Sequence, residues 1–226
     1  MGRIEAICIS TARGTQKRPV GSAEFVADWG IRGEAQGGHW HRQVSLLSAD
    51  RIDAFRARGA QGENRAFGEN LVVRGFDFST FPVGTLFKSG DVLLELTQIG
   101  KECHQHCAIY QAVGDCIMPR EGVFARVIRG GIARTGDELV LAERRERRPY
   151  QAAVITLSDK GSQGKRQDTS GPAIAARLKD SGYDVVETLL LPDEAAALRQ
   201  QLCRLADQRQ VDLIVTTGGT GFSPRD

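Results

Sequence analysis

The residues best suited to chemistry lie between positions 98 and 131, a stretch that contains three of the five cysteines of the chain and two of its four histidines. Cys103 and Cys107 lie there in a polar segment, with Lys101 before them and the two histidines beside them. Positive neighbours stabilise a thiolate, which is the form of cysteine that attacks electrophiles and binds metals. We therefore predict a reactive thiolate at Cys103 or Cys107, and we rank Cys103 first.

A structural zinc site is the alternative use of these side chains. The candidate ligands are Cys103, His104, His106 and Cys107, joined by His39 and His41 from earlier in the chain. Structural zinc sites usually bring together two well-separated pairs of ligands, whereas four of these residues fall within five positions. The spacing therefore favours a reactive thiol over zinc. Cys8 and Cys116 are expected to be small hydrophobic core residues instead.

Basic and polar residues in the same part of the chain predict a site for an anionic ligand such as a phosphate, which arginine matches with a planar fork of donors. Two glycine-framed blocks, GIRGEAQGGHWHRQVSLL (30–47) and FGENLVVRG (67–75), add histidine, glutamate and asparagine. His39 and His41 would share one face if their segment were extended, because strand side chains repeat every two residues. The candidate ligand-binding residues are His39, His41, Arg42, Glu69, Asn70, Lys101, Arg120, Arg126 and Arg129.

A second set of candidate residues follows the predicted strands after residue 150. Ser158 and Asp159 follow the first strand, Asp193 follows the second, and TTGGTGFSPRD (216–226) follows the third. In open α/β sheets, ligands bind beyond the carboxyl ends of the strands. Glycines there allow backbone N–H groups to approach a phosphate, although they could equally make only a turn. Asp193 is a candidate Mg²⁺ ligand, and its alternative role is that of a helix N-cap.

The elements that must position the first set of residues are predicted to be mostly β. Short apolar runs separated by glycine turns occupy residues 4–9, 43–47, 70–73, 92–97, 123–128 and 138–141. This rhythm indicates a mostly antiparallel barrel or sandwich with few helices. One helix is expected from Ala49 to about Arg58, with Ser48 as its cap and Gly59 as its end.

After residue 150 the pattern changes to alternating strands and helices. Residues 152–157 form a continuous apolar run, which is typical of a strand covered on both faces. Strands are predicted at 152–157, 185–191 and 213–217, and helices at 172–181 and 193–208. The order βαβαβ implies an α/β fold with a parallel sheet.

The composition excludes several classes of protein. The chain has 226 residues, with 30 Lys and Arg against 28 Asp and Glu, and a net charge of +2 disfavours a nucleic-acid-binding protein. No apolar run reaches the ~20 residues of a membrane span, and no signal peptide is recognisable. Five cysteines are an odd number, which fits free thiols. We expect a cytoplasmic protein without a nucleic-acid or membrane partner, and the sequence is compatible with an oligomer.

The charged run ERRERRP (143–149) predicts a domain boundary, because a charged stretch closed by proline does not easily carry a packed face. We predict one domain over residues 1–142, a linker over residues 143–150 and a second domain over residues 151–226. The length fits one full domain and part of another, since domains average ~150 residues.

Residues 151–226 resemble the first half of the molybdopterin adenylyltransferases, through ITLSDKGSQGKRQDTSG (155–171), LLLPDE (189–194) and the TTGGTG loop. The resemblance implies transfer of AMP from ATP to molybdopterin, with Asp193 and Asp226 as the catalytic, Mg²⁺-binding acids. The pocket would be lined by Ser158, Asp159, Gly218, Gly219, Thr220 and Gly221. The family continues beyond the position of Asp226, so we expect an incomplete α/β domain, a longer natural protein and negligible adenylyltransferase activity in this chain.

Residues 1–142 resemble the MOSC domain, named for the C-terminal domain of molybdenum cofactor sulfurase, through the glycine-histidine block, the GEN block and the late cysteines. The resemblance implies a β-barrel-like fold that binds the molybdenum cofactor, and a cysteine that carries sulfur or ligates molybdenum. Cys103 is the first candidate for that cysteine and Cys107 the second. The pyridoxal-phosphate domain that accompanies some MOSC domains is absent from this sequence, so sulfur would come from a separate donor protein. A cofactor carrier without catalysis is the alternative.

Overall fold

The structure is a computed structural model that describes residues 1–57, 67–102, 116–143 and 148–219. The chain divides into two compact units, Met1–Arg147 and Arg148–Asp226, which we call the N-unit and the C-unit. Several predicted site residues lie outside the described residues, namely Cys103, His104, His106, Cys107, Thr220, Gly221 and Asp226.

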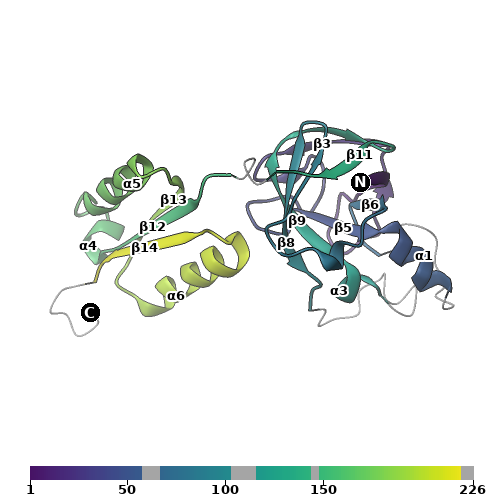
Figure 1. Ribbon diagram of the computed structural model, residues 1–226. Helices are drawn as coiled ribbons and strands as arrows, with labels where there is room; N and C mark the ends of the chain where they lie inside the picture. The colour runs from purple at the N-terminus through teal and green to yellow at the C-terminus, as the bar shows by residue number, and fades with distance from the viewer. Residues whose placement is uncertain (58–66, 103–115, 144–147, 220–226) are drawn as a thin grey trace. The chain divides into compact units, whose positions relative to one another are not determined.

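The N-unit is built on a closed barrel of seven strands, which confirms the predicted β-barrel (Figure 1). In order around the barrel, the strands are β1 (Gly2–Ile9), β6 (Leu71–Arg74), β5 (Val44–Ser48), β9 (Val123–Arg129), β8 (Val92–Ile99), β7 (Leu86–Ser89) and β11 (Glu138–Leu141). Pairing of β11 with β1 closes the ring. All neighbours are antiparallel except β5 and β6. Closure leaves the barrel without unpaired strand edges.

The apolar runs predicted neither the barrel strand β7 nor several short elements of the N-unit. The short elements are β2 (Arg18–Pro19), β3 (Ser22–Val26), β4 (Gly30–Ile31), β10 (Gly131–Arg134), the 3₁₀ turn η1 (Phe78–Thr80) and α3 (Met118–Glu121). In β3 only Phe25 is buried, and in β10 only Ala133 is buried. A strand with one buried residue has no apolar run to reveal it.

Helix α1 (Ala49–Ala57) begins where the sequence predicts, with the Ser48 hydroxyl oxygen 3.4 Å from the backbone nitrogen of Arg51. Its buried residues Ile52 and Phe55 belong to a core cluster outside the barrel interior. Cys8 is fully buried in this cluster and Cys116 packs against it, as expected of small core residues.

The barrel interior is filled by alternate side chains of the strands. On β9, Val123, Ala125 and Val127 point into this core, while Phe124 packs in the cluster beneath α1. Four phenylalanines of the interior contact one another with ring centroids 5.3 to 5.9 Å apart, namely Phe76, Phe78, Phe81 and Phe87. The alternation places Phe124 and Arg126 on the opposite face of β9 from the barrel core.

The C-unit is a three-stranded parallel sheet, which confirms the predicted βαβαβ order. The central strand β12 (Gln151–Leu157) pairs with β13 (Asp184–Leu191) and with β14 (Leu213–Gly218). Helices α4 (Asp159–Ser162) and α5 (Ser170–Asp180) cover one face, and α6 (Ala195–Cys203) covers the other (Figure 1). Six of the seven residues of β12 are buried, as its continuous apolar run predicts.

The second predicted helix, residues 193–208, differs from the structure at both ends. Helix α6 begins at Ala195, and after Cys203 the chain continues as the π-helical segment η3 (Arg204–Arg209). Gln210 ends it in the left-handed region, with φ of 52°. Among the described residues, no helix is both long and apolar enough to cross a membrane.

Candidate cofactor-binding sites

The C-unit contains a cavity of about 260 Å³ at the carboxyl ends of β12 and β14, where the topology of a parallel sheet predicts a ligand site. Hydroxyl and charged groups dominate its lining, contributed by Thr156, Ser158, Arg166, Asp168, Thr169, Ser170 and Thr217. The predicted site residues Ser158 and Gly218 both line it. Hydroxyls and an arginine can donate to phosphate oxygens, so the lining suits an anionic, polar ligand.

Gly218 shapes this cavity through its backbone. Its φ is +90°, and a Cβ at this position would overlap the carbonyl oxygen of Leu157 on the neighbouring strand. Gly219 follows with φ of +64°. Only glycine combines this backbone conformation with the close approach at position 218, so Gly218 does more than end a strand.

Asp159 and Asp193 bind each other's backbone across the ends of β12 and β13. The backbone N–H of Asp159 donates to Oδ2 of Asp193 over 3.0 Å, and the N–H of Asp193 donates to Oδ1 of Asp159 over 3.1 Å. Asp193 therefore accepts from the first N–H of α4, whose N-cap is Ser158, whereas the cap position of α6 is Glu194 without a side-chain bond. The predicted role of Asp193 as the cap of its own helix is wrong.

The second carboxylate oxygen of Asp193 supports a role as a cation ligand. Oδ1 is buried and has no hydrogen-bond partner among the described residues, and it lies 3.9 Å from the position of a Cβ on Gly219. A carboxylate oxygen that faces the start of the glycine loop fits the oxygen ligands that Mg²⁺ requires.

Sequence reasoning missed Asp168, which lines the cavity and starts α5. Its Oδ1 accepts from the backbone N–H groups of Ser170 and Gly171, each over 3.0 Å. A Cβ on Gly171 would lie 2.6 Å from the hydroxyl oxygen of Thr156 and 2.5 Å from Oδ2 of Asp168, so glycine is required here too. The signal was present as QDTSGP, because acidic and hydroxyl residues before a helix mark its cap.

The N-unit holds a buried histidine next to two arginines. His41 is 5% exposed, and its Nδ1 lies 3.4 Å from the hydroxyl of Thr97. That hydroxyl donates to the carbonyl oxygen of His41 over 2.7 Å. Burial, and then the charges of Arg42 and Arg126, lower the pKa of His41 to about 4, so the ring is neutral at neutral pH.

The Arg42 side chain packs against Phe124, which shares one face of β9 with Arg126. The guanidinium carbon of Arg42 is 4.9 Å from the ring centroid of Trp40 and 5.7 Å from that of Phe124. Arg126 is 4% exposed and shares its face of the strand with Phe124. Two guanidinium groups beside a neutral histidine make this face a candidate site for an oxyanion.

His39 does not share the surroundings of His41, contrary to the extended geometry considered from the sequence. His39 is exposed, and its Nδ1 lies 3.0 Å from the carbonyl oxygen and 3.2 Å from Oδ2 of Asp28. The segment bends, because the backbone N–H groups of Gly38 and Trp40 donate to the carbonyls of Trp29 and Gly38. Neighbouring residues of a bend do not keep the two-residue repeat of a strand.

Comparison with known families assigns both units. Residues 33–140 match the MOSC domain family, and residues 153–226 match the family described as a probable molybdopterin binding domain. The chain joins a MOSC domain to a molybdopterin-binding domain. Both families belong to molybdenum cofactor metabolism.

The curated relatives match the molybdopterin-binding domain. The molybdopterin adenylyltransferase of Escherichia coli (strain K12) is 40% identical over 75 residues, which are 32% of this chain and 38% of the relative. That of Pyrococcus furiosus is 40% identical over 77 residues, 34% of this chain and 44% of the relative. The chain therefore spans about two fifths of the length of these relatives. The YUAD protein of Bacillus subtilis shares the fold, with a TM-score of 0.53 and 18% identity over 62% of this chain and 94% of that protein.

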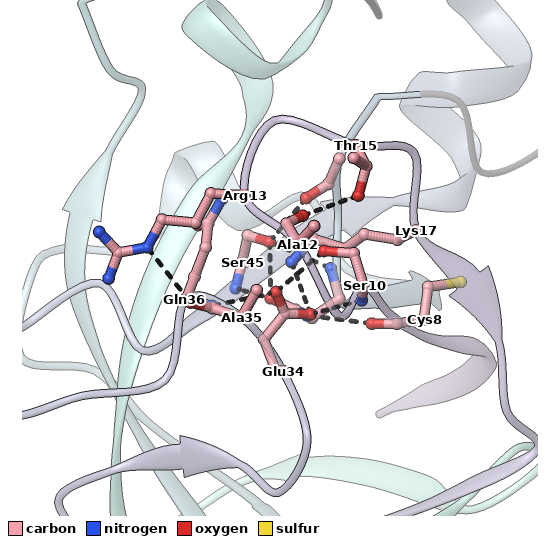
Figure 2. A network of polar contacts seen from close by, with 12 residues as sticks. Cys8, Ser10, Ala12, Arg13, Thr15, Lys17, Glu34, Ala35, Gln36 and Ser45 are labelled. Atoms are coloured by element: carbon pink, nitrogen blue, oxygen red, sulfur yellow. Dashed lines mark hydrogen bonds and ion pairs between the residues drawn. The ribbon is translucent and has the colours of Figure 1, made fainter.

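Asn70 of the GEN block is buried and bonds to Ser45, Cys8 and Glu34. Figure 2 shows these three partners close together in a network of polar contacts. Oδ1 of Asn70 accepts from the backbone N–H and the hydroxyl of Ser45, over 3.0 and 2.9 Å. Its Nδ2 donates to the carbonyl of Cys8 over 3.0 Å and to Oε2 of Glu34 over 2.8 Å. Asn70 thus uses both donors and both acceptor positions within the protein, and it joins β1, β5 and the segment around Glu34.

Lys17 and Glu34 complete this network, and sequence reasoning missed both. Nζ of Lys17 lies 3.1 Å from Oε2 of Glu34, and the two side chains are 2% and 0% exposed (Figure 2). Burial lowers the pKa of Lys17 although Glu34 opposes the shift. Burial also raises the pKa of Glu69, whose Oε2 accepts from the backbone N–H of Phe67. Nothing local in the sequence marks Lys17 as buried, because its partner is distant along the chain.

The remaining predicted basic residues lie at the ends of MOSC-domain elements. The backbone N–H of Lys101 donates to the carbonyl of Pro119. Arg120 on α3 and Arg129 at the end of β9 are exposed, and Nε of Arg129 donates to the carbonyl of Asp91 over 2.9 Å. Arg42 is half-buried, so Arg126 is the one fully buried side chain among the four predicted arginines.

Proposed function

We propose that this protein binds molybdopterin or the molybdenum cofactor in both of its domains. The observation that carries the proposal is the cavity at the carboxyl ends of β12 and β14, which lies in sequence 40% identical to a molybdopterin adenylyltransferase. The arginine-rich face of the MOSC domain supports it independently, because the cofactor carries a phosphate.

In the molybdopterin-binding domain, the cavity would hold molybdopterin through the hydroxyls of Ser158 and Thr217 and the charge of Arg166. Asp193 and Asp226 would hold Mg²⁺, and the free, buried Oδ1 of Asp193 supports the first of these assignments. Bound Mg²⁺ would neutralise charge at phosphorus in transfer of AMP from ATP. The hydroxyls and the arginine of the cavity would hold the phosphate of molybdopterin close to the phosphate of ATP that is transferred with AMP.

In the MOSC domain, a thiolate at Cys103 or Cys107 would attack the outer sulfur of a persulfide on a separate donor protein, so that the cysteine becomes the persulfide and the donor leaves as a thiolate, or it would ligate molybdenum. Arg42 and Arg126 would bind the phosphate of the pterin. A carrier without catalysis uses the same binding groups and differs only in the absence of sulfur transfer.

Mass spectrometry of the full chain tests the sulfur-carrying role. After incubation with molybdopterin and a sulfur donor, we expect a mass increase of one sulfur atom, lost on reduction and absent from Cys103→Ser or from Cys107→Ser. Cys203→Ser is the matched control, since Cys203 is an exposed cysteine of the other domain. Retention of the added sulfur in both variants would exclude these cysteines, and bound cofactor without added sulfur would indicate a carrier.

Equilibrium dialysis tests the second domain. Asp193→Asn is expected to weaken Mg²⁺-dependent binding of ATP about tenfold or more, because a neutral amide is a poor ligand for a hard cation. Asp180→Asn, at the last residue of α5, is the control for loss of one negative charge. Equal ATP binding by the two variants would exclude Asp193 as a Mg²⁺ ligand.

A further inference from the structure

Trp40 is held in one orientation by contacts on several sides. Its indole N–H donates to the carbonyl oxygen of Gln36 over 2.9 Å. Its ring meets that of His41 edge-on, with centroids 6.4 Å apart, and the guanidinium of Arg42 lies over it at 4.9 Å. An aromatic ring fixed in this way presents a defined negative face to a cation.

Arg42 is oriented by aromatic rings and not by a carboxylate. Its guanidinium lies over Trp40 and Phe124, and no carboxylate of the described residues lies within ion-pair distance of it. Its Nε is buried and has no hydrogen-bond partner in that part of the chain. Arg74 shows the contrast, because Glu5, Asp50 and Asp53 all pair with it.

Arg42 and Arg74 differ in whether the N–H groups of the guanidinium are already used in hydrogen bonds to the protein. A contact with the face of a ring holds the guanidinium without using its N–H groups, whereas an ion pair uses them. Arg42 therefore keeps its two terminal Nη groups, already oriented by the rings and unpaired within the described residues, as donors for a ligand. Arg126, on the face of β9 that bears Phe124, adds a second positive charge.

We propose that Arg42 is the residue of the MOSC domain that binds the phosphate ester of the cofactor, and that Trp40 is the positioning residue that holds its guanidinium for that ligand. This inference rests on the proposed function and adds to it how the domain distinguishes a phosphorylated pterin from an unphosphorylated one. A planar fork selects a tetrahedral oxyanion through two parallel hydrogen bonds.

In the full chain, tryptophan emission reports ligand binding in the MOSC domain alone. Both tryptophans of the protein, Trp29 and Trp40, lie in this domain, so their emission reports ligands bound there. The Trp29→Phe variant restricts the signal to Trp40. For variants of Trp40, the NMR signal of the Arg42 Nε–H group replaces emission. The probes are a pterin phosphate monoester, the same pterin without phosphate, and inorganic phosphate.

Arg42→Gln is expected to weaken binding of the pterin phosphate by about 10- to 100-fold, and to leave binding of the unphosphorylated pterin unchanged. Arg42→Lys keeps the charge but not the fork, so we expect an intermediate loss. Trp40→Leu should weaken the phosphate ester about fivefold or more, and Trp40→Phe should restore most of the affinity. Arg32→Gln is the control, since Arg32 is an exposed arginine paired with Glu24.

The outcomes separate this inference from the function on which it rests. If the wild-type domain binds neither pterin, the proposed function fails for this domain. If it binds both pterins equally, or if Arg42→Gln retains the preference for phosphate, the inference is overturned while cofactor binding stands. Equal losses in Trp40→Phe and Trp40→Leu would overturn the role of Trp40. Inorganic phosphate that binds as tightly as the ester would overturn recognition of the cofactor.

Discussion

Asn70 is the residue whose structural role differs most from its appearance in the sequence. As part of the GEN block it was a candidate ligand-binding residue, yet its amide makes four hydrogen bonds to Ser45, Cys8 and Glu34. A buried amide with no donor or acceptor to spare connects the strands around it. The carboxylate of Glu34 depends on this amide and on Lys17.

Replacement of Asn70 by alanine is expected to lower the free energy of unfolding of the MOSC domain by about 3 kcal/mol, because it leaves buried groups of Glu34 and Ser45 without partners. Urea denaturation followed by tryptophan emission measures the change. Thr15→Ala removes an exposed hydrogen bond to Ala12 and should change stability by less than about 0.5 kcal/mol. A loss below about 1 kcal/mol for Asn70→Ala would contradict its connecting role.

His41 makes stability dependent on pH in the acid range. Its pKa in the folded protein is about 4, below the ordinary value of 6.5, because burial and two arginines disfavour the charged ring. Between these two pH values the unfolded chain binds a proton that the folded chain does not, so stability falls as pH drops through this window. The full effect is about 3 kcal/mol.

His41→Gln removes this titrating group, so its free energy of unfolding should fall less than that of the wild type between pH 7 and pH 4. Denaturant unfolding at a series of pH values measures both slopes. Parallel slopes in the two proteins would show that the ring of His41 is not held neutral by its surroundings.

At the scale of elements, the end of β14 depends on a glycine at position 218. Gly218→Ala places a methyl group against the carbonyl oxygen of Leu157 and imposes a positive φ on alanine. We expect a loss of about 2–4 kcal/mol in stability of the molybdopterin-binding domain, together with loss of ligand binding at the cavity. Thermal unfolding by circular dichroism and equilibrium dialysis with molybdopterin measure the two effects.

Gly164→Ala is the matched control for the backbone conformation. Gly164 also has a positive φ, of +71°, but a Cβ there meets no atom within 4 Å. It should therefore cost only about 1 kcal/mol, the conformational penalty without the clash. If the two variants lose equal stability, close approach to Leu157 is not what requires glycine at position 218.

At the scale of the whole molecule, the two units have separate hydrophobic cores and should unfold in separate transitions. Tryptophan emission reports only the MOSC domain, while far-UV circular dichroism reports both domains. We expect the two signals to give different midpoints in urea. Gly218→Ala should shift only the transition that is absent from tryptophan emission, and coincident shifts of both signals would show that the domains unfold as one unit.

Much of the fold could be predicted because its signals are local. The apolar run of β12 indicated a strand buried on both faces, and the alternation with helices fixed a parallel sheet. β3 and β10 could not be predicted, since each buries a single residue and owes its pairing to a distant strand. In the C-unit, the cavity lies at the carboxyl ends of the strands, as a parallel sheet predicts, but Asp168, which lines it, was not predicted from the sequence.

The sequence by itself determined the two families, the alternation of strands and helices after residue 150 and the glycines at the carboxyl end of β14, because these depend on periodicity, turn chemistry and motifs of neighbouring residues. Only the tertiary structure decided which polar residues are buried together. Lys17 meets Glu34, Asn70 meets Cys8, and Arg42 meets Phe124. Each contact joins segments far apart in the chain, and a side chain's charge, pKa and freedom to bind a ligand are set by such neighbours in space and not by its neighbours in sequence.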